Sequence, residues 1–241
     1  MPKPKAAPRT TSFKTIHARA EKRKGGPAAL QKLLPRKPDP KALAKLTDDR
    51  ALAEMTKRVF SAGFAWSVIE AKWDGFEDAF LGFVPGKLTF QPEDYWHELL
   101  VDTRIVRNGA KIQSVRDNAA FVQAIAGEHG SFGKFLAGWP PSNEVALLEL
   151  LAKRGSRLGG NTGQMFLRFV GFDGFVTSQD VIACLRDAGL DIGSEAKSKS
   201  DLAKVQAQFN AWAQETGLSY VQLSRICALS IGENRSEHHA A

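Results

Sequence analysis

The segment Val59–Trp73 constrains the fold more than any other part of the chain. It has no charged side chain before Glu70 and contains two tryptophans, Trp66 and Trp73. A helix that is apolar around its whole circumference belongs in the core of a domain rather than on its surface. We therefore expect a core helix here, interrupted at Gly63, and ask whether it also forms the floor of a binding pocket.

The rest of the sequence predicts further helices and no strands. Apolar residues recur at helical spacing after capping residues, and no stretch alternates apolar with polar side chains. We predict an all-α, bilobed bundle over residues 41–231, followed by a frayed tail at 232–241. The best-defined helices are expected at residues 50–60, 111–126, 144–153, 179–188, 202–216 and 220–230.

The positive charge is concentrated in the first forty residues. Eleven Lys and Arg against two acidic residues give residues 1–40 a charge of +9, whereas the whole chain carries +7, so the remainder is slightly acidic. Proline, lysine and arginine dominate this stretch, and its composition is typical of disorder. We expect residues 1–40 to be a basic arm, either simply solvated or bound non-specifically to phosphates.

Composition also restricts the class of protein. At 43% hydrophobic residues the chain can bury a substantial core. No run of 18 apolar residues is present, so no membrane span is expected, and the N-terminus lacks the apolar region of a secretory signal. The two cysteines, Cys184 and Cys227, are expected to be buried thiols in a reducing cytoplasm.

Four stretches in the middle of the chain carry a family resemblance through their order and spacing. They are Ala62–Trp66 (AGFAW), the aromatic series Phe76, Phe80 and Phe83, Asp102–Ile112 (DTRIVRNGAKI), and Lys153–Gly155. Over about residues 50–190 the chain resembles the bacterial DNA-3-methyladenine glycosylase I family. The resemblance implies a helix-hairpin-helix DNA glycosylase-like fold, with double-stranded DNA as the partner.

The same resemblance implies an activity. The expected protein is a monofunctional DNA N-glycosylase of base excision repair, which hydrolyses the N-glycosidic bond of alkylated purines such as 3-methyladenine. It would act as a monomer in the cytoplasm, without a cofactor. Two alternatives stay open: a catalytically weak or inactive DNA-binding paralogue that recognises damaged or distorted DNA, and an all-α interaction domain unrelated to DNA.

The chain departs from the family pattern in two places. The family's N-terminal segment supplies pocket aromatics and two zinc ligands, and residues 1–49 contain nothing like it. Separated cysteines and scattered histidines do not provide the about four ligands of a structural zinc, so we predict no metal. The family's acid that contacts the flipped base, eight positions before Trp66, corresponds to Arg58, which would repel a cationic purine.

The base pocket is expected around the AGFAW motif. A glycosylase stacks its extruded base between aromatic faces and reads the polar edge of the base. Trp66 aligns with a pocket tryptophan of the family, and a plain core tryptophan is the alternative. Phe60, Phe64 and Arg58 complete the predicted pocket.

Three carboxylates are candidates for the catalytic anion. An anion near the sugar stabilises oxocarbenium character in the transition state. Glu54 lies one helical turn before Arg58, and the alternative is a surface ion pair. Glu70 follows Trp66 by one turn and would need a partner if buried. Asp180 lies near the position of the superfamily's catalytic aspartate, and helix capping after Thr177 is the alternative.

A glycine-rich stretch after Lys153 is expected to be the DNA-binding hairpin. Glycines let backbone N–H groups approach a phosphate at a helix N-terminus. A plain interhelical loop is the alternative. The predicted DNA-binding residues are Lys111, Lys153, Arg154, Arg157, Leu158, Gly159, Gly160, Asn161, Thr162 and Gly163.

Overall fold

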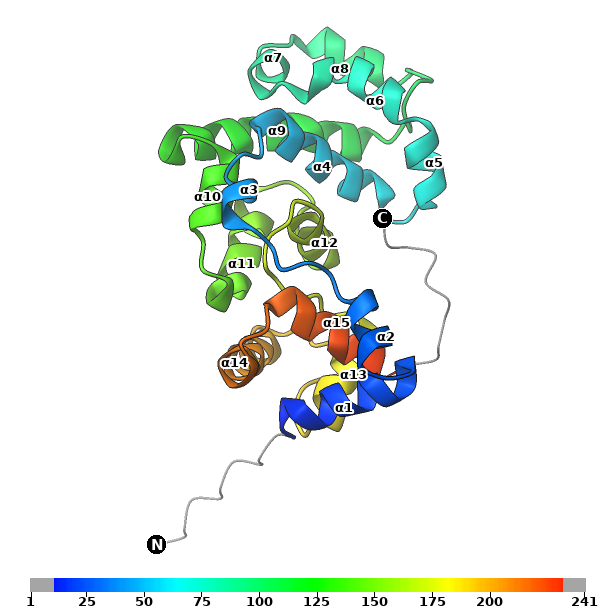
Figure 1. The fold of residues 1–241 in the computed structure, drawn as a ribbon. Coiled ribbons are helices and arrows are strands. Elements are labelled where there is room, and N and C mark those ends of the chain that lie inside the picture. The colour runs from blue at the N-terminus through cyan, green and yellow to red at the C-terminus, as the bar shows by residue number, and fades with distance from the viewer. Residues whose placement is uncertain (1–10, 232–241) are drawn as a thin grey trace, which may run out of the picture. The chain divides into compact units, whose positions relative to one another are not determined.

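The computed structural model describes residues 11–231, in which every regular element is a helix (Figure 1). This confirms the all-α prediction for that part of the chain. The helices form two compact units. The central unit comprises residues 38–174, and the terminal unit combines residues up to 37 with those from 175 onward.

The terminal unit joins helices from both ends of the sequence. Its helices are α1 (Phe13–Lys24), α2 (Pro27–Leu33), α13 (Gln179–Asp187), α14 (Lys199–Thr216) and α15 (Tyr220–Ser230). Helix α1 packs chiefly against α15, and Figure 1 shows the two side by side. The two ends of the described chain therefore complete one unit together.

The predicted disordered arm is wrong for residues 11–40. Helix α1 is capped by Ser12 and ends at Gly25, which adopts the left-handed conformation. It buries Phe13, Ile16 and Ala20, and the Phe13 ring lies 5.2 Å from that of Trp212. Basic residues occupy the remaining positions, so the composition resembles that of a disordered segment although one helical face is apolar.

The predicted single domain over residues 41–231 also differs from the structure. The chain starts the terminal unit, crosses into the central unit at residue 38 and returns at residue 175. The core of each unit therefore draws on its own helices. The expected tail at 232–241 and the first ten residues of the expected arm lie outside the described residues.

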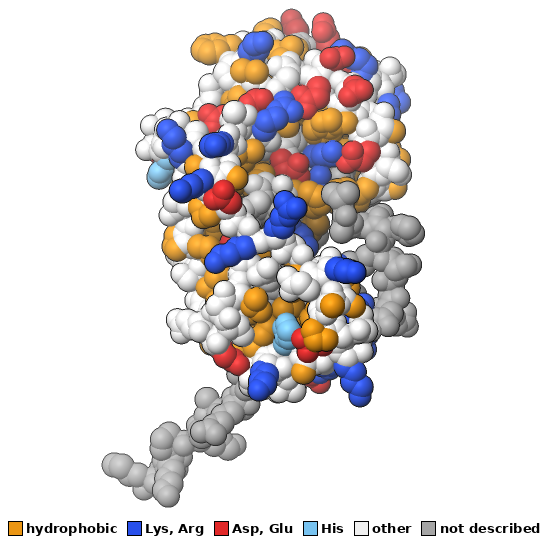
Figure 2. All heavy atoms as spheres, in the orientation of Figure 1, with side chains coloured by type: hydrophobic (Ala, Val, Ile, Leu, Met, Phe, Trp, Pro, Cys, Tyr) orange, Lys and Arg blue, Asp and Glu red, His pale blue; other side chains and the backbone are white. Residues whose placement is uncertain are grey.

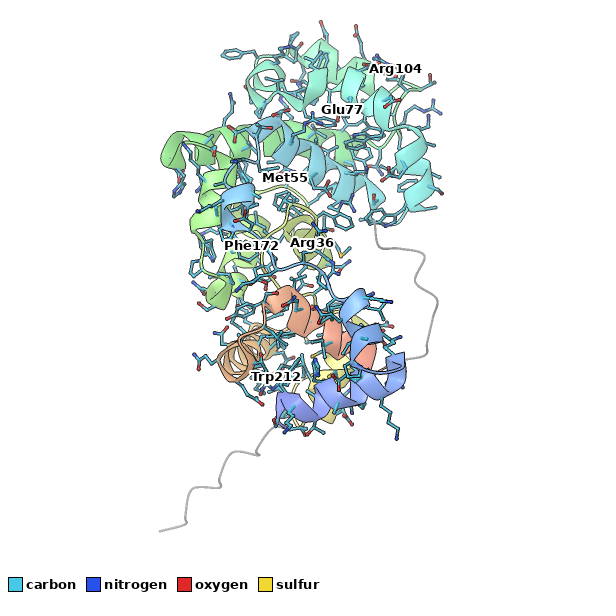
Figure 3. All side chains as sticks on the ribbon, viewed as in Figure 1. Arg36, Met55, Glu77, Arg104, Phe172 and Trp212 are labelled. Carbon is cyan, nitrogen blue, oxygen red and sulfur yellow. The ribbon has the colours of Figure 1, made fainter. Side chains whose placement is uncertain are left out.

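The central unit holds the apolar segment Val59–Trp73. Its helices are α3 (Pro40–Leu43), α4 (Asp48–Ser61), α5 (Trp66–Ala71), α6 (Trp73–Ala79), α7 (Pro85–Thr89), α8 (Glu93–Leu99), α9 (Gly109–His129), α10 (Phe132–Gly138), α11 (Glu144–Arg154) and α12 (Asn161–Phe169), with 3-10 turns η1 (Leu81–Phe83) and η2 (Pro141–Asn143). Helices α4 and α9 pack against each other along their lengths (Figure 1). Met55 of α4, labelled in Figure 3, is fully buried.

Val59–Trp73 is not one core helix. Helix α4 ends at Ser61, Gly63 adopts φ +80°, and a separate short helix, α5, begins at Trp66. Phe60 and Ile69 are fully buried, whereas Phe64 and Val68 are exposed. The apolar residues around Gly63 therefore form an exposed turn that leads into α5, whereas Phe60 and Ile69 belong to the core.

The helices of residues 11–231 include none that is long and apolar enough to cross a bilayer. Within the same range, no group of three or more His, Cys, Asp or Glu side chains is placed to hold a metal ion. Cys184 and Cys227 are buried free thiols.

Candidate functional site

The most unusual arrangement in the central unit is the environment of Arg58. Its side chain is almost wholly buried, and the guanidinium carbon lies 4.0 Å from the ring centroids of both Trp66 and Phe169. The two rings are themselves 5.4 Å apart. A guanidinium group over an aromatic face is held by cation–π attraction. We call the pair of rings Trp66 and Phe169 the aromatic slot, and the Arg58 guanidinium lies against both of them.

The second wall of the slot comes from the end of α12, about a hundred residues after the first. Phe169 is 41% exposed, and Trp66 is half-buried. No sequence motif marks Phe169, so it was not among the predicted site residues. The only signal for Phe169 was the helical spacing of apolar residues along α12, and that spacing is equally typical of residues packed in a core.

Glu54 lies one turn before Arg58 on α4. Its Oε1 is 2.6 Å from Arg58 Nε, but the two groups are not aligned as a hydrogen bond, and neither atom has a hydrogen-bond partner among the described residues. Burial is the main cause of both pKa shifts: it raises the pKa of Glu54, against the opposing charges of Arg58 and Lys57, and lowers that of Arg58. Glu54 is thus the desolvated carboxylate of the slot region.

A cavity of about 260 Å³ lies beside Glu54. Its lining residues come from α4, from the segment before it, and from the ends of α6 and α12: Leu46, Arg50, Ala53, Glu54, Lys57, Trp73, Phe169 and Val170. The volume is slightly below the ~300–1,000 Å³ of most small-molecule pockets. Phe169 and Glu54 belong both to this cavity and to the surroundings of Arg58.

Ion pairs hold the rim of the cavity in place. Arg50 makes a two-pronged contact with Glu77, at 2.7 and 2.9 Å, and Trp73 Nε1 donates to the same carboxylate at 3.0 Å. Figure 3 labels Glu77 on α6. Lys57 Nζ lies 4.9 Å from the centroid of the Trp73 ring. Trp73, expected to be a core residue, therefore presents part of its surface to the cavity.

The other two predicted carboxylates lie outside the cavity lining. Glu70 is exposed and pairs with Lys57, with 2.7 Å between Nζ and Oε1. Asp180 is exposed in the first turn of α13 and belongs to the terminal unit. Ser178, not Thr177, caps that helix by accepting from the Val181 N–H. Of the three candidates, Glu54 alone lies beside aromatic walls.

The structure separates the two phenylalanines of the predicted pocket. Phe60 is fully buried and packs edge-on against Phe76, with 4.8 Å between ring centroids. It is therefore a core residue, and its prediction as a pocket wall is wrong. Phe64 is 42% exposed on the turn after α4, with Lys111 Nζ 4.6 Å from its ring centroid.

Lys111 fastens the start of α9 to the end of α4. Its Nζ donates to the carbonyl oxygens of Phe60 at 3.0 Å and Ala62 at 2.7 Å. Unsatisfied carbonyls at a helix C-terminus attract a cation. The side chain is 7% exposed, and burial lowers its pKa. Its predicted contact with DNA is therefore wrong in this structure, because the ammonium group is committed to the backbone.

The glycine-rich stretch is a short loop between α11 and α12. Buried Asn118 holds this loop by two hydrogen bonds to the backbone of Ser156, donating to its carbonyl at 3.0 Å and accepting from its N–H at 2.7 Å. Leu158 is fully buried beneath the loop. A Cβ at Gly163 would collide with the Leu158 carbonyl oxygen, so only glycine allows this close approach.

The loop ends in a conformation that requires glycine. Gly160 has φ 57° and ψ −134° and precedes the first residue of α12, and no side chain caps that helix. The backbone N–H groups of Asn161, Thr162 and Gly163 lie in the first turn, where a helix presents donors. This geometry fits the predicted hairpin, whose contact with DNA stays a prediction.

The basic residues around the loop differ in their surroundings. Lys153 and Gly159 are exposed, and Arg157 is exposed with its Nε donating to the Ala110 carbonyl at 3.2 Å. Arg154 pairs with Glu128 at 2.8 Å. On the face shown in Figure 2, acidic and basic side chains are interspersed over the central unit.

Comparison with known proteins finds a family model that matches part of the central unit. The family model described as methyladenine glycosylase matches residues 43–150, which include α4, Arg58, Trp66 and the whole of α9. The resemblance read from the motifs is confirmed over this segment, which is similar to the methyladenine glycosylase family.

Several solved structures are similar to parts of the chain. A crystal structure of 3-methyladenine DNA glycosylase I is 23% identical, with a TM-score of 0.47, covering 53% of this chain and 81% of its own. A 3-methyladenine DNA glycosylase I from Staphylococcus aureus is 22% identical, with a TM-score of 0.47, covering 53% and 78%. A mutant of the enzyme from the same organism is 21% identical, with a TM-score of 0.47, covering 64% and 87%.

Proposed function

We propose that the protein is a monofunctional DNA N-glycosylase that removes alkylated purines from double-stranded DNA. One observation carries the proposal: the segment that matches the methyladenine glycosylase family supplies Glu54, Trp66 and Trp73, which lie around the aromatic slot and the adjoining cavity. A flat ligand suits such surroundings, because aromatic faces stack on bases and a desolvated carboxylate accepts hydrogen bonds.

The chemistry demands little acid assistance from the protein. An alkylated purine carries a positive charge that is neutralised as the glycosidic bond breaks, so the base is already a good leaving group. The enzyme must extrude the base and bind it more tightly as the bond breaks. Glu54 is the carboxylate placed to contribute, whereas Glu70 is exposed and paired with Lys57.

Contact with DNA is proposed at the loop between α11 and α12. The N–H groups that open α12 would approach one phosphate, and exposed Lys153 and Arg157 would add positive charge. The clamp from Asn118 holds the loop in shape before DNA arrives. Action as a monomer in the cytoplasm stays a prediction.

The decisive experiment measures release of free base from methylated duplex DNA by the full chain. We expect release of 3-methyladenine, and a loss of at least about tenfold in rate for Phe169→Ala, which removes one aromatic wall. Phe90→Ala is the matched control, because Phe90 is 87% exposed and lies outside the site. No base release under conditions where an active glycosylase releases it would refute the proposal.

A second function is favoured by Arg58. Because its guanidinium lies against both walls of the aromatic slot, the slot is not open to a base, which suits a DNA-binding protein that does not excise. That function predicts saturable binding to damaged or distorted duplex without base release. It also predicts loss of binding in Gly160→Asp, because the substitution strains the loop and places a negative charge beside the phosphate.

A further inference from the structure

A second cluster of reactive side chains lies in the terminal unit, where α1, α13 and α15 pack together. Cys184 of α13 and Cys227 of α15 are both fully buried, and their thiols are hydrogen-bonded to each other. Both are free thiols in this structure. The candidate site in the central unit uses neither of them, so the pair is available for a separate role.

Arg19 reaches this thiol pair from α1. Its Nη2 donates to Cys184 Sγ at 3.8 Å and to Ser230 Oγ at 3.3 Å, while its Nη1 pairs with Asp187. Ser230 Oγ also lies 3.4 Å from Cys184 Sγ. A cationic group beside a sulfur stabilises the thiolate, which is the nucleophilic form of cysteine. Three helices of the terminal unit therefore place polar groups around one sulfur atom.

The two thiols are not equivalent. The hydrogen bond from Cys227, with those from Ser230 and Arg19, outweighs burial and lowers the pKa of Cys184 to about 7. Burial is the main cause that raises the pKa of Cys227 well above its ordinary value, and the hydrogen bond to Cys184 adds to it. Cys184 is therefore the nucleophile of the pair at neutral pH, and Cys227 stays a protonated thiol that donates to it.

We propose that Cys184 and Cys227 form a modification site, at which a hydroperoxide converts the two thiols into a disulfide that joins α13 to α15. The inference goes beyond the proposed function and does not depend on it. It rests on the contact between the two sulfur atoms, which lets them bond without a rearrangement of the helices, and on the guanidinium of Arg19 beside one of them.

The reaction takes place in two steps. The Cys184 thiolate attacks one oxygen of the peroxide, so that an S–O bond forms, the O–O bond breaks, and the other oxygen leaves as hydroxide or alkoxide. The product on Cys184 is a sulfenic acid. The Cys227 sulfur then attacks the sulfenic sulfur, and its proton leaves with the hydroxyl group as water. The two thiols together lose two electrons, which the peroxide gains.

A small oxidant has a route to the buried sulfur past Arg19. The Arg19 side chain is 34% exposed, whereas its Nη2 contacts Cys184. Exposed side chains change rotamer within picoseconds to nanoseconds, so displacement of this arginine can open a path from solvent without unfolding a helix. Hydrogen peroxide is small enough to use such a path. A bulky oxidant such as glutathione disulfide should therefore react more slowly with the folded protein.

The test treats the full chain, under native conditions, with hydrogen peroxide and follows it by intact-mass spectrometry and peptide mapping. We expect the wild-type protein to lose two hydrogens as the Cys184–Cys227 disulfide forms, and to regain them on reduction with dithiothreitol. In Cys227→Ser the reaction should stop at a sulfenic acid on Cys184, which dimedone traps. In Cys184→Ser the oxidation of Cys227 should be at least about tenfold slower.

A pair of matched variants tests the role of Arg19. Arg19→Gln and Asp187→Asn both remove the ion pair between α1 and α13, but only Arg19→Gln takes the guanidinium away from Cys184. The pH at which oxidation reaches half its maximal rate should rise in Arg19→Gln, whatever the effect on access, and should not rise in Asp187→Asn. Equal midpoints in Arg19→Gln and the wild-type protein would refute the role of the guanidinium.

The wild-type protein alone can overturn the inference. Failure of the disulfide to form in the native protein, or its formation only in urea, would show that the folded terminal unit does not present these thiols to an oxidant. A native disulfide that links Cys184 to Cys227 supports the modification site, whether or not the protein releases bases from DNA.

Discussion

Glu54 and Arg58 lie one turn apart on α4, with 2.6 Å between Oε1 and Nε, and Arg58 is the more deeply buried of the two. A buried charge that loses its partner is destabilising by about 3–5 kcal/mol. We expect Glu54→Leu to lower the free energy of unfolding toward the lower end of that range, because Glu54 keeps some exposure. The double variant Glu54→Leu with Arg58→Met should recover most of the loss. Urea denaturation of the wild-type protein, of Glu54→Leu, of Arg58→Met and of the double variant measures each loss of stability. Equal losses in Glu54→Leu and in the double variant would contradict this expectation.

The two adjacent glycines of the loop should behave differently. Gly160 has φ 57°, where an L residue is strained by about 1–3 kcal/mol, whereas a Cβ at Gly159 would meet only Ala152 Cβ at 3.6 Å. Gly160→Ala should therefore lower both stability and DNA affinity, and Gly159→Ala should change stability little. Thermal unfolding and DNA titration check both variants. Equal effects at the two positions would mean that backbone conformation is not the cause.

Substitutions at Lys111 and Lys153 should distinguish a structural role from an electrostatic one. Lys111→Met should destabilise the protein by about 1–3 kcal/mol, because two carbonyls at the end of α4 lose their donor. Lys153→Met should leave stability unchanged and weaken DNA binding. It should reduce the slope of log affinity against log salt by about 0.9 if it contacts one phosphate. Weaker DNA binding by Lys111→Met without a loss of stability would instead indicate that Lys111 contacts DNA.

Tyr95 gives the chain a pH-dependent contribution to stability. Burial raises its pKa to about 12, and its hydroxyl donates to the Ala79 carbonyl at 2.5 Å. Because the folded pKa exceeds the ordinary value of 10.0, the contribution is present below pH 10 and is lost as pH rises from about 10 to 12. The chain has two tyrosines, so absorbance of tyrosinate can resolve them. Tyr95→Phe should remove the titration step near pH 12; an unchanged titration curve would contradict the assignment.

Helix positions followed from local signals. The helices expected at residues 111–126, 144–153 and 220–230 coincide with α9, α11 and α15 to within a few residues. Caps and apolar spacing are encoded within a few residues of each helix, so the sequence alone specifies them. Helix α1 carried the same signals in Ser12, Phe13 and Ile16, but the surrounding charge obscured them, and its packing partner comes about two hundred residues later.

The candidate site depended on distant contacts and was predicted only in part. Sequence comparison indicated that Arg58 stands where the family has an acid. It gave no means of knowing that Phe169 would meet the guanidinium from the end of α12, or that Lys57 would reach both Trp73 and Glu70. Glu54 was one of several candidate carboxylates until the fold placed it beside the cavity.

The interleaved order of the two units bears on how the chain is made. Every residue of the central unit has been synthesised once residue 174 is complete, so this unit can fold while the chain is still growing. Helix α1 is made first but must wait for α15, its main partner, to emerge near the end of synthesis. Until then Phe13 and Ile16 lack their final environment, and nascent chains stalled before α15 should be the ones most prone to capture by chaperones.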